Sequence, residues 1–226
     1  MEATRHMSAP PDRRPAGSLT AALLESERDT LARIADEPFL SGLAEGSLTD
    51  ACLNAWLCED WHFVTSMRRT LGVLVHDGPD EETVDLVGGA FPVIRAELDR
   101  FEGEIERRGL DVGPAPGRVV ADFNAAVHSA FSAGPASALA SYWALEHAYW
   151  WAWSRIRERI GISGPYGGWI DNWSSPEFAA FVSELADLVD RHSELSVAAP
   201  IVRDVFARER RLWRYLWDIG TGPPAI

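Results

Sequence analysis

Three acidic residues, Asp60, Glu146 and Glu209, lie in stretches of the sequence whose other residues are mostly apolar. In a helix, positions three, four and seven apart share a face. By that spacing Asp60 shares a face with Trp56, Phe63, Val64 and Met67. Glu146 shares one with Tyr142, Trp143, Tyr149, Trp150 and Trp153, and Glu209 shares one with Val205, Phe206, Leu212, Trp213 and Leu216. A buried carboxylate without a partner raises its pKa, and carboxyl groups that titrate near neutral pH suit proton transfer. The three acids therefore predict one interior pocket for acid–base chemistry.

Each of these acids also has a purely structural explanation. An acid on an apolar face is often half-buried and paired with an arginine, and all 21 basic residues of this chain are Arg. The ten Trp residues allow the same two interpretations. Flat rings fill the core of a wide helical bundle, and they also line pockets that bind flat heteroaromatic ligands. The rings of residues 142–153 are denser than packing alone requires, which favours a pocket beside Glu146.

One pair of residues, Glu59 and His62, has the Glu-x-x-His spacing found in di-iron carboxylate bundles. A complete site needs a second such pair, and His128, His147 and His192 have no acid three residues before them. We therefore expect no metal and no cofactor. The alternative is a non-haem di-iron oxidase, with possible ligands Glu59, His62, Glu97, Glu146, His147 and His192.

The composition excludes several classes of function. The chain has 226 residues, enough for one large domain, and a net charge of −13. This charge argues against binding to nucleic acid and against docking on anionic membranes. Because the sequence has no Lys, it cannot form a lysine Schiff base or a P-loop. Cys52 and Cys58 are too few for a disulfide scaffold, and the absence of an apolar signal segment predicts a cytoplasmic protein.

Almost every periodic stretch predicts helix, so we expect a single-domain, all-α bundle of about seven or eight helices over residues 18–226. Residues 1–17 lack periodicity and are expected to form a disordered tail. Pro92 is expected to kink its helix, and residues 37–42 are expected to be a loop. The expected helices cover about 18–35, 49–76, 80–108, 118–132, 135–160, 169–173, 174–192 and 196–217.

Three stretches give the sequence a family resemblance. They are residues 38–48 (PFLSGLAEGSL) followed by 56–61 (WLCEDW), residues 166–178 (YGGWIDNWSSPEF), and residues 206–213 (FARERRLW). In order and spacing they resemble the TenA family of thiaminase II and aminopyrimidine aminohydrolases, over residues 20–218. The resemblance implies the haem-oxygenase-like all-α fold, hydrolysis of a small heteroaromatic amine in thiamin salvage, no cofactor, and a homo-oligomer, either dimer or tetramer.

The resemblance also implies roles for individual residues. Asp60 matches the aspartate that hydrogen-bonds the aminopyrimidine, and Glu209 matches the catalytic glutamate. Glu146 falls where the cysteine-type members have their nucleophile, which places this chain in the branch that lacks the catalytic cysteine and uses a glutamate.

The pocket rings implied by the resemblance depart from the family's usual residues. Where the family has pocket tyrosines, this chain has Phe63, Phe123, Trp150 and Trp173. We therefore expect stacking on these rings without hydrogen bonds from hydroxyl groups. A non-catalytic binder of aromatic ligands and the di-iron oxidase remain the alternatives to the hydrolase.

Overall fold

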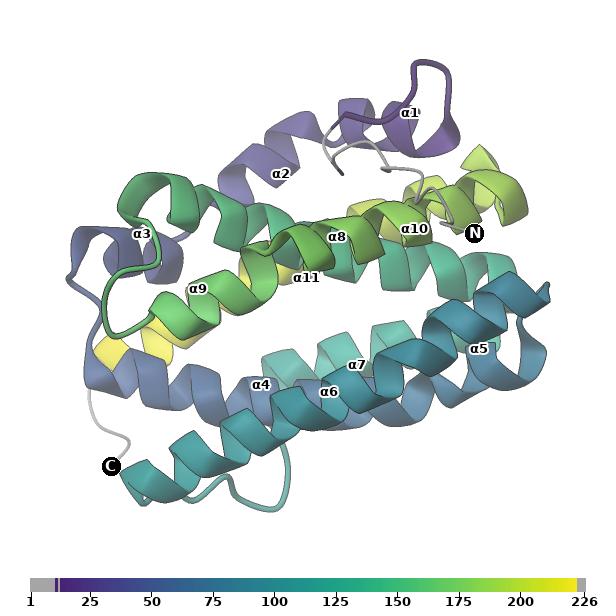
Figure 1. Ribbon diagram of the computed structural model, residues 1–226. Coiled ribbons are helices and arrows are strands. Elements are labelled where there is room, and N and C mark those ends of the chain that lie inside the picture. The colour runs from purple at the N-terminus through teal and green to yellow at the C-terminus, as the bar shows by residue number, and fades with distance from the viewer. Residues whose placement is uncertain (1–10, 12, 223–226) are drawn as a thin grey trace, which may run out of the picture.

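The computed structural model describes residue 11 and residues 13–222, and within them it contains helices and no strand (Figure 1). This confirms the expected all-α class. The helices are α1 (Leu19–Ser26), α2 (Arg28–Ile34), α3 (Pro38–Glu45), α4 (Asp50–Thr70), α5 (Gly72–Asp77), α6 (Glu81–Arg108), α7 (Arg118–Ser132), α8 (Pro135–Ile160), α9 (Gly167–Ser174), α10 (Pro176–His192) and α11 (Leu195–Thr221). None of them is long and apolar enough to cross a membrane.

The helix boundaries follow from capping residues that the sequence displays. The hydroxyl groups of Ser18, Thr49 and Ser175 accept hydrogen bonds from backbone N–H groups of the first turns of α1, α4 and α10, and the Asp80 carboxylate does so for α6. Gly109 ends α6 at a φ of 63°, a conformation that favours glycine. These caps explain why the long helices begin and end close to their expected positions.

The described residues form eleven helices, more than the seven or eight expected, for three local reasons. The first helix is interrupted at Glu27, and the second is interrupted at Leu71, just before Gly72. The expected loop at 37–42 is wrong, because these residues begin α3. Pro38 occupies its first turn, where the missing N–H has no cost.

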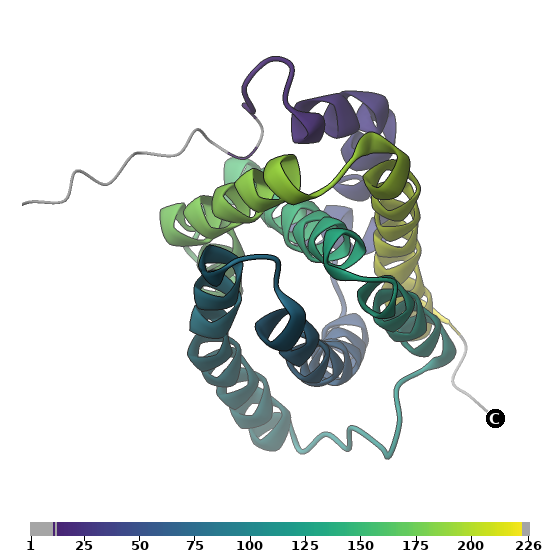
Figure 2. The ribbon, with the colours of Figure 1, turned by 90° about the vertical axis from the view of Figure 1, so that its right-hand side faces the viewer.

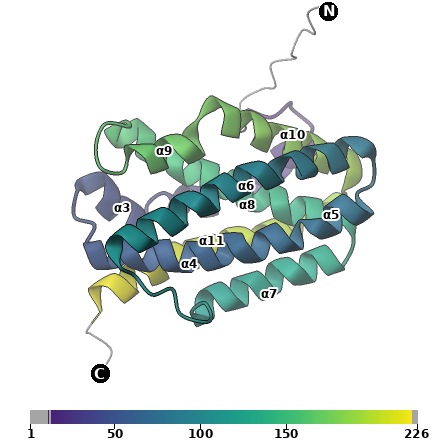
Figure 3. The same ribbon diagram turned by 60° about the horizontal axis from the view of Figure 1, so that its bottom comes forward.

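Helix α8 forms the centre of the bundle. It packs against α7, α9, α10 and α11, and 14 of its 26 residues are buried. Figure 2, which looks along the bundle, shows α8 surrounded by the other long helices. Helices α4, α6 and α7 form the opposite side, with α4 between and in contact with both (Figure 3). A polar side chain on the inner face of α8 therefore lies inside the protein.

Buried ion pairs fasten peripheral segments to this bundle. The Glu37 side chain, only 3% exposed, accepts hydrogen bonds from Arg210 and Arg214 of α11 at 2.8–3.1 Å. Arg14 lies within the expected disordered tail, yet its side chain is buried and donates to Asp190 of α10 at 2.9 Å. Residues 1–10 and 12 of that tail lie outside the described residues.

Replacing Glu37 with Ala tests the contact between α3 and α11. We expect Glu37→Ala to lower the free energy of unfolding by about 2 kcal/mol, because two arginines lose charge-assisted hydrogen bonds. Urea unfolding measures this change. The control is Glu25→Ala, which removes an exposed pair with Arg28 and should have little effect. Equal effects of the two substitutions would contradict a stabilising role for Glu37.

Candidate active site

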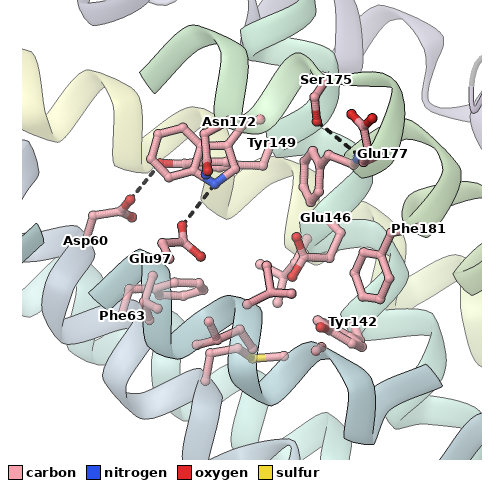
Figure 4. Close-up of a pocket in the computed structure, with 18 of the residues that line it drawn as sticks. Asp60, Phe63, Glu97, Tyr142, Glu146, Tyr149, Asn172, Ser175, Glu177 and Phe181 are labelled. Carbon is pink, nitrogen blue, oxygen red and sulfur yellow. Dashed lines mark hydrogen bonds between the residues drawn. The ribbon is translucent and has the colours of Figure 1, made fainter. Parts of the chain in front are cut away.

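A cavity of about 510 Å³ lies between α6 and α8 and is closed by α4, α9, α10 and α11 (Figure 4). Its walls are mostly apolar and aromatic, which is typical of small-molecule sites. The lining residues are Asp60, Phe63, Val64, Met67, Asp85, Leu86, Gly89, Ala90, Val93, Ile94, Glu97, Tyr142, Leu145, Glu146, Tyr149, Asn172, Trp173, Ser175, Glu177, Phe178, Phe181, Glu209 and Leu212.

Four carboxylates from four different helices meet in the interior of this cavity. They are Asp60 of α4, Glu97 of α6, Glu146 of α8 and Glu209 of α11. Asp60 and Glu209 are buried, whereas Glu97 and Glu146 expose part of their surface to the cavity. The three acids that the sequence singled out are therefore brought together, and the structure adds a fourth.

Asp60 is held in place by a short chain of hydrogen bonds. The indole N–H of Trp56 donates to the Tyr149 hydroxyl at 3.1 Å, and that hydroxyl donates to Asp60 Oδ2 at 2.7 Å. Because the indole can only donate, it directs the hydroxyl proton toward the carboxylate. The other Asp60 oxygen is not used by this bond.

Glu97 is fixed by a second indole. The Nε1–H of Trp173 donates to Glu97 Oε1 at 2.9 Å, as drawn in Figure 4. Trp173 in turn lies parallel to Trp169 at 5.5 Å and edge-on to Tyr149 at 5.1 Å. The aromatic side chains therefore position both Asp60 and Glu97.

Burial raises the pKa of all four carboxyl groups. The pKa of Asp60 rises to about 7, although the hydrogen bond from Tyr149 and the neighbouring indole N–H of Trp56 oppose the rise. The pKa values of Glu97, Glu146 and Glu209 rise to about 8, through burial first and then through repulsion from the Asp60 charge. Groups of this kind can hold or release a proton near neutral pH.

Not every ring that the sequence assigned to the pocket reaches it. Phe63 and Trp173 line the cavity, but Phe123 lies behind Phe63, at 5.1 Å between ring centres, and lines a separate cavity. Trp150 does not line the cavity either and contacts His147 instead. One helical position is 100° of rotation, so Trp150 points away from the face that carries Tyr149.

The expectation of a pocket without tyrosine hydroxyls is wrong. Tyr142 and Tyr149 both line the cavity, on the same face of α8 as Glu146. Helical spacing had already grouped them with Glu146, and that signal would have identified them. The same spacing places Glu97 near Val93, Ile94 and Phe101, so its position could also have been recognised.

The possible di-iron ligands are not brought together. Of the six, Glu97 and Glu146 line the cavity. Glu59 accepts from the Gly117 backbone N–H, and His62 bonds to the Val112 carbonyl oxygen. His147 is fully buried among aromatic rings, and His192 pairs with Asp80. Within the described part of the chain, no group of three His, Cys, Asp or Glu side chains could hold a metal ion.

The raised pKa values predict how stability depends on pH. Between the ordinary Glu pKa of 4.5 and about 8, folded Glu97 keeps a proton that the unfolded chain releases, so stability falls as pH rises. Glu97→Gln removes this contribution. Its melting temperature relative to wild type should therefore increase from about pH 5 to about pH 9.

The matched control is Glu106→Gln, which changes an exposed residue of the same helix. The difference in melting temperature between Glu106→Gln and wild type should not rise with pH in this way. If the melting temperatures of Glu97→Gln and wild type change in parallel over this pH range, Glu97 does not keep its proton in the folded protein.

Sequence comparisons relate the chain to proteins of thiamin metabolism. The profile of the TENA/THI-4/PQQC family matches residues 28–199. The thiamine biosynthesis multifunctional protein ThiED of Corynebacterium efficiens is 30% identical over 186 residues. The match covers 74% of this chain and 23% of ThiED, so the chain spans less than a quarter of that relative. An uncharacterized protein of Schizosaccharomyces pombe is 30% identical over 80 residues, which are 33% of each protein.

Solved structures of TenA homologues share the fold. A TenA homologue from Pyrococcus furiosus superimposes with a TM-score of 0.78 at 23% identity, covering 89% of this chain and 99% of its own. A TenA family transcription regulator from Silicibacter gives a TM-score of 0.76 at 18% identity, with coverages of 92% and 99%. These similarities confirm the haem-oxygenase-like all-α fold. Together with the profile match over most of its length, they establish that this chain belongs to the TENA/THI-4/PQQC family.

Proposed function

We propose that the chain is an enzyme that hydrolyses an aminopyrimidine or a similar small heteroaromatic amine. The observation that carries this proposal is the meeting of Asp60, Glu97, Glu146 and Glu209, all with raised pKa values, in one cavity with aromatic walls. Aromatic walls accept a flat ring, and carboxyl groups that titrate near neutral pH supply acid and base. The similarity to a thiamine biosynthesis protein supports an aminopyrimidine as the substrate.

The proposed reaction replaces a C–N bond by a C–O bond. An aminomethyl pyrimidine and water give the hydroxymethyl pyrimidine and ammonia, with no oxidant or reductant consumed. Water supplies the new oxygen. The leaving nitrogen takes a proton from an acid, and the attacking water gives one to a base, so the carboxyl groups return to their starting protonation after one proton exchange.

Substrate binding is assigned to Asp60 and the rings around it. The oxygen of Asp60 that Tyr149 does not use accepts from the amino group of the pyrimidine. Of the four aromatic residues expected to bind the substrate, Phe63 and Trp173 line the cavity. Their rings stack on the substrate or contact its edge. The hydroxyl of Tyr149 fixes the direction of the Asp60 carboxylate and so the orientation of the ring.

Glu209 and Glu146 are assigned the proton transfers. Glu209 is buried, and its Oε1 has no hydrogen-bond partner among the described residues, so a protonated Glu209 is free to donate to the leaving amine. Glu146 stands in the middle of the cavity in Figure 4 and takes the proton of the water. The Glu146 charge disfavours ionisation of Glu209, so Glu209 keeps its proton while Glu146 is ionised.

A glutamate mechanism also agrees with the positions of the cysteines. Neither Cys52 nor Cys58 lines the cavity, and Cys52 is packed against the Trp217 backbone at the other side of α4. Glu146 of α8 faces the site in their place. This placement supports the assignment of the chain to the branch without a catalytic cysteine.

Replacement of Glu209 by Gln tests the mechanism. We expect Glu209→Gln to lower kcat for 4-amino-5-aminomethyl-2-methylpyrimidine by at least about 100-fold, because general acid catalysis contributes 10²- to 10⁴-fold. Chromatography of the pyrimidines and an ammonia assay measure the turnover. Glu106→Gln, an exposed change of the same kind, should turn over like wild type.

Two results would contradict the proposal. Retained turnover in a folded Glu209→Gln protein would remove Glu209 from the reaction. A wild-type protein that releases no ammonia from this substrate would reject the aminopyrimidine hydrolase itself.

A further inference from the structure

The side chains that line the cavity include acidic residues and no basic residue among those described. Besides the four inner carboxylates, Asp85 and Glu177 line it, and none of its described lining residues is Arg, Lys or His. Both outer acids are exposed, and they lie near the surface of α6 and at the first turn of α10. A positively charged group of a ligand would therefore be attracted by these acids, and a negatively charged group would be repelled.

The inner acids have no cationic partner within the cavity. Arg100 is the cation that affects Glu97, and it has the smallest influence on that group. Its guanidinium donates to the Gly168 carbonyl and lies 5.4 Å from the Trp169 ring centre. Among the buried side-chain atoms of the described residues that have no hydrogen-bond partner, Glu209 Oε1 is the one whose residue lines the cavity. A cationic nitrogen donor from a ligand would supply what these groups lack.

The cavity is also elongated. On α6 its lining residues run from Asp85 to Glu97, and twelve residues of helix at 1.5 Å each span about 18 Å. In Figure 4, Asp60 and Glu97 lie at one end of the view, Tyr142 and Phe181 lie at the other, and Glu146 lies between them. A single six-membered ring with short substituents fills only part of this length.

The part of the cavity wall that lies between the inner acids and Asp85 is mostly apolar. Leu86, Ala90 and Ile94 of α6 face this section, together with side chains of the helices opposite. The residues of those helices are Val64, Met67, Leu145, Phe178 and Phe181. An apolar section between two acidic ends fits a ligand with two charged ends joined by methylene groups.

The rim of the cavity along α6 is open to solvent. Asp85, Gly89 and Val93 are exposed, and their spacing of four residues puts them on one face of α6. A Cβ added at Gly89 would have nothing within 4 Å, so the helix leaves space at this point of the rim. A ligand can enter here with its second charged group remaining beside Asp85.

We propose that the substrate is an elongated amine with two cationic nitrogens, one at the inner carboxylates beside the aromatic ring and one at Asp85, joined by an apolar segment. This inference rests on the proposed function, because it takes the cavity as the place where the C–N bond is hydrolysed. The bond broken is the one at the inner end. Water supplies the oxygen, the ring side becomes the alcohol, and the inner nitrogen leaves as an amine that carries the apolar segment and the outer ammonium group.

Two isosteric ligands test the outer charge. N-benzyl-1,10-decanediamine and N-undecylbenzylamine have the same number of non-hydrogen atoms, and they differ in a terminal amino group that replaces a methyl group; their ten-methylene chain is long enough to reach from the inner acids toward Asp85. We expect the diamine to bind the whole protein about fivefold more tightly at low ionic strength, as measured by calorimetry. Equal binding, or tighter binding of the monoamine, would overturn the proposal.

Matched variants assign the effect to the cavity. Asp85→Asn should remove the advantage of the diamine, whereas Asp99→Asn, on the same helix but outside the cavity, should keep it. Glu97→Gln should weaken binding of both amines, because both carry the inner nitrogen. An advantage that survives Asp85→Asn would overturn the assignment of the outer nitrogen to Asp85.

The two proposals fail in different ways. Ammonia release from the aminopyrimidine without any preference for the diamine would reject the elongated substrate and keep the hydrolase. A preference for the diamine that depends on Asp85, without ammonia release from the aminopyrimidine, would have the opposite meaning. It would exclude the aminopyrimidine as substrate and support binding of a ligand with two positive charges.

Discussion

The structure depends on the burial of four carboxyl groups in one cavity without a cationic side chain among the lining residues. Burial raises the pKa of each group, the Asp60 charge raises the pKa of the other three, and the Glu146 charge raises the pKa of Glu97 and Glu209 further. Such a cluster opposes folding once the groups ionise, so the rest of the bundle must hold it together. The rigid parts of the site are the aromatic side chains. Trp56 acts on Asp60 through Tyr149, and Trp173 acts on Glu97 directly.

Helix α8 contributes to both the cavity and the hydrophobic core, with different faces. One side of the helix carries Tyr142, Glu146 and Tyr149 toward the cavity, while Trp143 and Trp153 pack into the core. Trp153 is in ring contact with Trp56, Trp173 and Trp213, so the cavity wall and the core share the same side chains. Movement of one carboxylate would therefore disturb aromatic contacts that extend through several helices.

The fold class and the convergence of three acids could be predicted from the sequence, because both follow from helical periodicity. Asp60, Glu146 and Glu209 each break an apolar pattern, and a broken pattern can be seen one helix at a time. Glu97 was harder to recognise. Arg95, Asp99 and Arg100 surround it in the sequence, so the segment resembles a solvent-exposed face although Glu97 itself points inward. The start of α3 was missed because Pro38 suggests a loop and equally suits a first helical turn.

The aromatic residues show a second limit of prediction from sequence. Trp150 and Tyr149 are neighbours in sequence, and a difference of 100° decides which one faces the cavity. Periodicity places both near Glu146, and contacts of Tyr149 with α4, α9 and α11 decide that Tyr149 faces the cavity. That selection has a chemical consequence, since Tyr149 brings a hydroxyl group where Trp150 would bring an N–H donor. The hydroxyl accepts from Trp56 and donates to Asp60, whereas an indole cannot accept and so could not pass on the orientation. The direction of the Asp60 carboxylate in the cavity thus follows from the position of one residue on the central helix.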